Sequence, residues 1–264
     1  MKDLREFWQV LEEFYQKNEV CLLATVIHTE GSAPRKIGTK AIFNKAGEVI
    51  WGTIGGGSVE HAIQKEVRNL IPGNLPIYKE YELVEGDYGI CGGKIGIFLE
   101  LFGENPNAVI VGGGHIGQAL APLLRRLEFN VIVLDPRDEL KDKKSFRNIP
   151  VITGKSYSEL IKFTKLSGEV YYIIVTYNHE GDEESLIECL KRPSAYVGMI
   201  GSKRKVRTLF SNLIDRKIST QEQLDTVHAP IGLAIHSETP EEIAVSIAGE
   251  LIKIRAERRQ QNDK

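Results

Sequence analysis

The sequence feature that most constrains the fold is a glycine-rich turn between a strand-like run and a helix-like run. Residues 108–117 (AVIVGGGHIG) place Gly112, Gly114 and Gly117 in the pattern GxGxxG, and the next apolar run ends at Asp135. In this context the first glycine permits a tight turn, the second lets a phosphate approach the backbone, and the third lets the helix pack closely on the strand. The segment predicts a Rossmann-type domain.

The rest of the second half supports a mostly parallel sheet, because strand-like and helix-like runs alternate there. The expected strands are 108–111, 131–135, 150–153, 170–176 and 196–200, and the expected helices are 116–127, 156–166, 183–191, 203–214 and a long one from Pro240. The segment between the last two helices, rich in His and Pro, is expected to be a loop. In such sheets, ligands bind at the carboxyl ends of the strands.

The first half has a different pattern, with short β-rich runs between two helices. Strands are expected at 20–27, 39–43, 49–54, 77–83 and 94–102, and helices at 4–15 and 59–70. A polar Gly/Pro cluster at 103–107 separates this part from the apolar start of the second half. We therefore predict an α/β protein with an N-terminal α+β domain (1–104) and a Rossmann-like domain with a mostly parallel sheet (105–264).

Composition excludes several classes of function. The chain has 34 basic and 36 acidic residues, so no broad positive field attracts nucleic acid. Its apolar runs are too short to span a membrane, and its charged start without an apolar signal region favours the cytoplasm. Cys21, Cys91 and Cys189 are widely separated and form no CxxC pair, so neither a disulfide framework nor a metal site is expected.

Several side chains near the GxGxxG turn are candidate ligand groups. His115 can face a phosphate or act as an acid, or be an exposed polar residue. Asp135 can hold a ribose diol, and Arg137 can present its planar fork to a phosphate or carboxylate, or form a surface salt bridge. Two further strand ends, 176–182 and 198–205, outline a crevice; the basic run 203–207 is either a solvated helix face or an anion site.

The first half contains two more glycine-rich candidates. Gly55, Gly56 and Gly57 precede a helix that carries Glu60 in its first turn, which indicates either a second anion cradle or a tight packed turn. Glu60 can complement the helix dipole or hydrogen-bond to a heterocycle. Cys91 is followed by Gly92 and Gly93, so its thiol can be accessible and can contact sulfur or a soft metal.

Together, these segments resemble the XdhC/CoxI family over residues 21–252. The matching segments, in chain order, are GSAPRKIGTKA, GTIGGGSVEHA, CGG, VGGGHIGQALAPL, VLDPR, YVGMIGSKRK and HAPIGLAIHSETPEEIAVSI. Carried over from the family, the cofactor-binding positions fall on the glycine, cysteine and acidic residues Gly55, Gly56, Gly57, Glu60, Cys91, Gly92, Gly93, Gly112, Gly114, Gly117 and Asp135. One departure is Ser58, where a branch of the family has cysteine.

The resemblance implies an accessory protein of molybdenum hydroxylases such as xanthine dehydrogenase, an enzyme of purine metabolism. Such a protein binds molybdenum cofactor (molybdopterin), holds it while a cysteine desulfurase supplies the terminal sulfur, and inserts it into the apo-enzyme. The expected protein is a maturation factor and a homodimer, not a stand-alone xanthine dehydrogenase, because the chain lacks the cysteine clusters of iron–sulfur centres.

Two other functions fit the sequence. In the first, the protein is a small NAD(P)-dependent oxidoreductase that uses the GxGxxG domain, with His115 or His179 as proton donor. In the second, the Rossmann half senses a nucleotide and the first half binds a partner protein. A nucleotide such as NAD(P) can also accompany the pterin in the accessory protein, since the fold by itself does not select its ligand.

Overall fold

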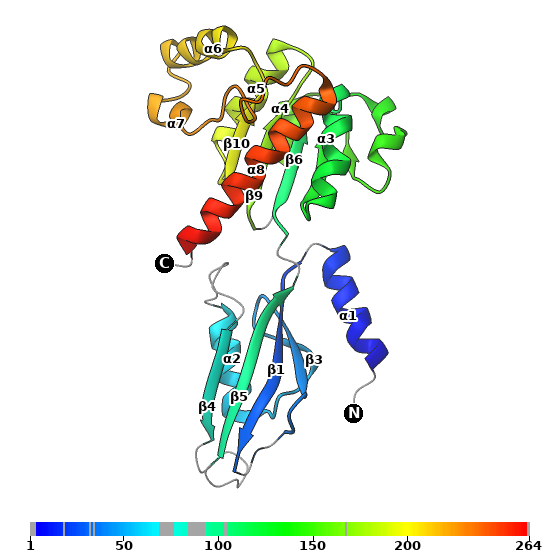
Figure 1. Ribbon diagram of the computed structural model, residues 1–264, viewed down its shortest axis with the longest axis vertical. Coiled ribbons are helices and arrows are strands. Elements are labelled where there is room, and N and C mark those ends of the chain that lie inside the picture. Colours follow the sequence, from blue (N-terminus) through cyan, green and yellow to red (C-terminus); the bar gives the residue numbers. More distant parts are fainter. Residues whose placement is uncertain are drawn as a thin grey trace. The chain divides into compact units, whose positions relative to one another are not determined.

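The computed structural model describes residues 4–262, apart from 18, 32, 34, 69–76, 84–92, 103–104 and 167. The chain divides into two compact units (Figure 1). The first consists of Met1–Glu104 with Arg259–Lys264, and the second of Asn105–Arg258.

The first unit is built on a five-stranded antiparallel sheet with strand order β3-β2-β1-β5-β4. Its elements are α1 (Leu4–Gln16), β1 (Cys21–Glu30), β2 (Lys40–Asn44), β3 (Val49–Gly52), α2 (Gly57–Arg68), β4 (Ile77–Leu83) and β5 (Gly93–Phe102). Neighbours in sequence are mostly neighbours in the sheet, as short hairpin connections require.

Strand β1 shows why this sheet carries a helix on each face. Successive side chains of a strand point to opposite faces. Leu22 and Ala24 belong to the core cluster that includes the apolar residues of α2, whereas Cys21 and Leu23 belong to the cluster that includes Phe7 of α1. Because both faces of β1 are apolar, the sheet needs the two helices to remove it from water.

The second unit is built on a five-stranded sheet in which all pairs are parallel. Its strands are β6 (Asn107–Val111), β7 (Asn130–Leu134), β8 (Val151–Ile152), β9 (Val170–Ile174) and β10 (Tyr196–Met199). Its helices are α3 (His115–Arg126), α4 (Tyr157–Phe163), α5 (His179–Leu190), α6 (Lys203–Asp215), α7 (Gln221–Asp225) and α8 (Pro240–Asn262), and two short 3-10 helices cover Asp138–Leu140 and Lys144–Phe146.

The strand order β10-β9-β6-β7-β8 is that of a doubly wound nucleotide-binding sheet, with the first strand in the middle. The chain reverses direction between β6 and β9, so the loops that follow these two strands diverge above the sheet. This arrangement confirms the predicted Rossmann-like fold. It also places the GxGxxG turn, which follows β6, at the point where such sheets open a ligand crevice.

The core lies on both faces of this sheet. Ala108 and Ile110 of β6 pack in one buried cluster with α3 and α8, and Val109 and Val111 pack in another with α4, α5 and α6. Every residue of β6 and β9 is buried. The near-continuous apolar runs of these strands follow from this double coverage. Among the described residues, no helix is both long enough and apolar enough to cross a bilayer.

Two helices differ from the expected pattern. The helix expected over 183–191 begins at His179, because the side chain of Asn178 accepts a hydrogen bond from the Gly181 N–H at 2.8 Å and caps the first turn. Within the segment expected to be a loop, Thr220 forms a capping box with Gln223 and starts the short helix α7. The cap residues, rather than the apolar periodicity, set both starting points.

Candidate functional site

The glycines of the GxGxxG turn have three separate steric roles. Gly112 has φ of +118°, and a Cβ atom there would lie 2.3 Å from the carbonyl oxygen of Val175. A Cβ at Gly117 would lie 2.2 Å from the carbonyl oxygen of Gly112. Gly114 differs, because its Cβ position has no atom within 4 Å. The turn and the helix packing therefore need Gly112 and Gly117, while Gly114 faces open space that a ligand can enter.

The N-terminus of α3 is electrostatically open. Its N-cap is Gly114, no side chain caps it, and its first turn carries no acidic residue. By contrast, side-chain oxygens of Ser156, Asn178 and Ser202 cap α4, α5 and α6. Backbone N–H groups at an uncapped helix start, together with the helix dipole, favour an anion. His115, the first residue of α3, is exposed at this end.

Asp135 is buried behind the turn, and its carboxylate is fully engaged. Oδ2 accepts hydrogen bonds from the Gly113 N–H at 2.8 Å and the Tyr157 hydroxyl at 3.2 Å. Arg137 donates from Nε to Oδ1 and from a terminal nitrogen to Oδ2, each at 2.8 Å, and its N–H also reaches Oδ1. The Asp135 side chain is 0% exposed. A ribose hydroxyl would have to displace one of these donors to reach it.

The exposed group at this position is Arg137. Its side chain is 36% exposed, and its guanidinium lies 5.2 Å from the centre of the Tyr177 ring. Burial raises the pKa of Asp135, but hydrogen bonds from Arg137 and Gly113 outweigh burial and hold that pKa below its usual value. The pair therefore stays ionised, and Arg137 presents the remaining face of its planar fork to a ligand.

The glycine turn of the first unit already holds an anion of its own. Gly55, Gly56 and Gly57 have φ values of +137°, +72° and +58°, which favour glycine. Oε1 of Glu60 accepts hydrogen bonds from the N–H groups of Ile54 and Gly56, both at 3.0 Å, and from the Thr53 hydroxyl at 2.5 Å. The predicted residues come together here, with the Glu60 carboxylate filling these donors.

The three cysteines differ in what the structure describes. Cys91 and Gly92 lie outside the described residues, while Gly93 is the buried first residue of β5. Cys21 and Cys189 are buried, and burial raises the pKa of Cys21 to about 11. Such thiols stay protonated at neutral pH and pack as small apolar side chains, as the sequence predicts for these two.

The structure adds residues that sequence reasoning missed. Tyr157 comes from α4 to reach Asp135, and Tyr177 follows β9 to pack against Arg137. Tyr177 also lines a pocket of about 760 Å³ between the strand ends 176–182 and 198–205, which the sequence expects to outline a crevice. The position of Tyr177 after a strand was the available signal, whereas nothing local in the sequence links Tyr157 to Asp135.

Residues 15–81 match the family described as "XdhC and CoxI family", and residues 108–251 match "XdhC Rossmann domain". A protein of Escherichia coli K12 named "Uncharacterized protein YqeB" is 27% identical over 238 residues, which cover 88% of this chain and 43% of that protein. A Bacillus subtilis 168 protein, named as a probable xanthine dehydrogenase subunit, is 20% identical over 332 aligned residues, covering 94% and 97%. This chain therefore spans less than half of the E. coli relative.

A crystal structure from Bacillus halodurans, titled as that of a xanthine dehydrogenase, superimposes with a TM-score of 0.51 at 21% identity. The match covers 95% of this chain and 96% of the other, and it shows a shared fold. The two family matches lie in the order in which the sequence segments occur, and together they extend over both units. They confirm the resemblance found in the sequence, and the chain belongs to the XdhC/CoxI family.

Proposed function

We propose that the protein is an accessory factor of a xanthine dehydrogenase system, which binds molybdenum cofactor and delivers it to the apo-enzyme. Family membership supports the accessory role. The observation that carries the binding role is the uncapped start of α3 at Gly114, with Arg137 beside it. These groups offer a backbone anion site and a planar cation within one crevice of the second unit.

The cargo has a phosphate, a fused heterocycle and a sulfur-ligated metal, and the chain offers donors suited to the first two. The open space at Gly114 lets a phosphate approach the N–H groups at the start of α3. Arg137 can donate to a phosphate or a heterocycle oxygen while its other face stays on Asp135. In the first unit, the Gly55–Gly57 turn and Glu60 are proposed to hold the heterocycle edge, together with Gly93 and Cys91.

Cys91 is proposed to contact the sulfur or the metal of the cargo, because a thiolate is a soft ligand. The proposal also includes a cysteine desulfurase as sulfur donor, a homodimeric state and a cytoplasmic location. A nucleotide such as NAD(P) is a further proposed ligand of the crevice. The chain would use its side chains for binding and release, since handover needs no turnover by the carrier itself.

The test is activation of a purified apo-hydroxylase by molybdenum cofactor that has been preincubated with the protein. The informative variant is His115→Glu, which puts a carboxylate in the first turn of α3. That change favours the helix dipole by about 0.3–1 kcal/mol, so folding is retained, but it fills and repels the anion site. We expect activation to fall at least tenfold relative to the parent protein.

The matched control is Ser211→Glu, which adds the same charge at an exposed position of α6. It should activate like the parent protein. Equal activation by His115→Glu would contradict the role given to the α3 terminus. Absence of activation by any form, combined with saturable binding and turnover of NADH, would favour the oxidoreductase instead.

A further inference from the structure

A second pocket-forming region lies away from the GxGxxG turn, at the carboxyl ends of β9 and β10. Its volume is about 760 Å³, and α5 and α6 form its sides. Met199, Val206 and Leu209 supply apolar surface, and Thr176, Asp182 and Lys205 supply polar groups. A cavity with mainly apolar walls and a few convergent polar groups is the usual form of a small-molecule site.

The cations beside this pocket stand where elementary electrostatics disfavours them. Lys203, Arg204 and Lys205 form the first turn of α6, at the positive end of its dipole, and no acidic residue balances them there. Among the described residues, neither Arg204 nor Lys205 has a carboxylate within ion-pair distance. Three cations at a helix N-terminus repel one another and the dipole, so a bound anion would relieve an existing strain.

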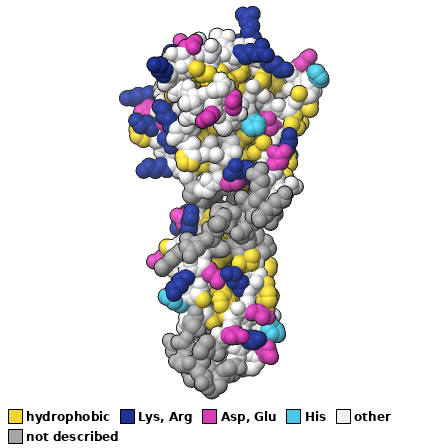
Figure 2. Space-filling view, turned by 90° about the vertical axis from the view of Figure 1, so that its left-hand side faces the viewer, with side chains coloured by type: hydrophobic (Ala, Val, Ile, Leu, Met, Phe, Trp, Pro, Cys, Tyr) yellow, Lys and Arg dark blue, Asp and Glu magenta, His cyan; other side chains and the backbone are white. Residues whose placement is uncertain are grey.

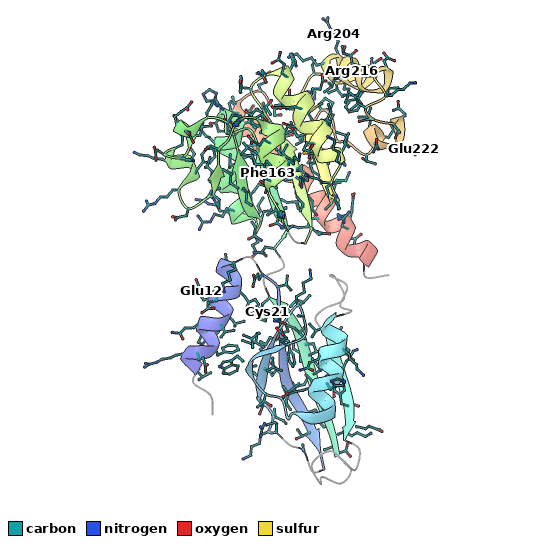
Figure 3. All side chains as sticks on the ribbon, turned by 180° about the vertical axis from the view of Figure 1, so that it is seen from behind. Glu12, Cys21, Phe163, Arg204, Arg216 and Glu222 are labelled. Carbon is teal, nitrogen blue, oxygen red and sulfur yellow. The ribbon has the colours of Figure 1, made fainter. Side chains whose placement is uncertain are left out.

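The placement of these cations is visible in the figures. In Figure 2, Lys and Arg side chains gather at the upper end of the second unit, at the height of α6 in Figure 1. Figure 3 shows the labelled Arg204 extending outward, which puts it at the mouth of the pocket. The other acidic group of the pocket wall, Glu183, is neutralised by an ion pair with Arg216.

Asp182 is the remaining acidic group, and its geometry favours a shared proton. The hydroxyl oxygen of Thr176 lies 2.7 Å from Oδ1 of Asp182 and 2.9 Å from the carbonyl oxygen of Asn178. A hydroxyl has one proton, so both contacts are hydrogen bonds only when Asp182 is protonated and donates to Thr176. Burial raises the pKa of Asp182 to about 6, against the lowering effects of Thr176, His179 and Lys205.

We propose that this pocket binds a small organic anion whose phosphate or carboxylate lies against Lys205 and Arg204 and whose planar or apolar body covers Met199 and Leu209. The site is separate from the proposed molybdenum-cofactor crevice at the α3 terminus, although Tyr177 borders both. Protonated Asp182 would leave the pocket positively charged, and ionised Asp182 would oppose the anion. Anion binding would therefore weaken as the pH rises through about 6.

Isothermal titration calorimetry with three probes tests the site: adenosine monophosphate, benzoate and inorganic phosphate. Saturable binding of either organic anion, at least tenfold tighter than inorganic phosphate, supports the proposal, and the tighter of the two identifies the preferred anionic group. Failure of both organic anions to bind at millimolar concentration overturns it. Equal affinity for inorganic phosphate overturns the role of the apolar surface.

Variants locate the binding. The double variant Arg204→Ala/Lys205→Ala should weaken binding at least tenfold, while Arg207→Ala, an exposed arginine of the same helix outside the pocket, should not. His115→Glu should also leave this binding unchanged, which separates the inference from the proposed function. Loss of binding in His115→Glu with no loss in the double variant would assign the anion to the α3 terminus and overturn the site.

The pH arm uses benzoate, because a phosphate ester has its own second pKa near 6. Binding to the parent protein should weaken several-fold as the pH rises through about 6, and Asp182→Asn should remove that dependence and keep the tighter affinity. Imidazoles can also change charge in this range, so the series is repeated with His179→Gln. A dependence that survives Asp182→Asn would overturn the role of Asp182.

Discussion

The substitution Arg137→Ala tests whether the buried carboxylate of Asp135 depends on its guanidinium partner. It removes two hydrogen bonds of 2.8 Å to a side chain that is 0% exposed. A hydrogen bond to a charged group contributes about 1.5–3 kcal/mol, and breaking a fully buried ion pair costs about 3–5 kcal/mol. Asp135 keeps donors from Gly113 and Tyr157, and Arg137 is partly exposed. We therefore expect a loss of about 2–3 kcal/mol at neutral pH.

The loss should depend on pH with a definite sign. Burial raises the pKa of Asp135, yet the hydrogen bonds from Arg137 and Gly113 hold it below the usual value. The folded state then binds this proton more weakly than the unfolded chain. The stability from the pair is fully present above the unfolded pKa of about 3.9 and is lost as the pH falls through the folded pKa. The difference between parent and variant should shrink in acid.

The assay is urea unfolding followed by far-ultraviolet circular dichroism and tryptophan fluorescence. Both tryptophans, Trp8 and Trp51, belong to the first unit, so fluorescence supplies an internal reference while circular dichroism reports on both units. The control Arg126→Ala removes an exposed arginine of α3 and should change stability by less than about 0.5 kcal/mol. Unchanged stability of Arg137→Ala at neutral pH, or an equal loss in acid, would refute the reasoning.

The remaining predictions concern three acidic or thiol groups. Glu60→Ala removes the acceptor for the Gly56 N–H and its neighbours and should destabilise the first unit by about 1–3 kcal/mol, with a smaller loss in Glu60→Gln; tryptophan fluorescence in urea measures both, and an unshifted midpoint would contradict the contacts. Glu250→Ala leaves the buried Tyr196 hydroxyl without its acceptor and should cost about 1–3 kcal/mol by circular dichroism; a parent-like curve would argue against that bond. Cys91→Ser should keep the fold and impair activation of the partner hydroxylase; undiminished activation would remove Cys91 from the mechanism.

Local sterics explain why the fold of the second unit could be predicted. Gly112 and Gly117 are needed by contacts within one strand, one turn and one helix, so their spacing in the sequence already carries the geometry. The alternation of apolar runs likewise carries the parallel sheet. The start of α5 and the presence of α7 were harder, because single cap residues decide them and the apolar pattern is weak there.

The site could be predicted less completely, because its polar contacts join segments that are distant in the sequence. The sequence places Arg137 next to Asp135 but does not show that the two close on each other, nor that Tyr157 completes the arrangement. Glu60 lies in the expected turn, yet its side chain satisfies that turn from within. In both places a side chain of the protein occupies donors that the sequence offers to a ligand.

The most direct test of the accessory role is retention of the cargo. Purified protein is mixed with freshly released molybdenum cofactor, unbound material is removed by gel filtration, and the retained pterin is oxidised to its fluorescent product. The account predicts stoichiometric pterin in the protein fraction, a marked loss in His115→Glu and parent-like retention in Ser211→Glu. Elution of the protein without pterin, while NADH binds saturably to the same preparation, would contradict it.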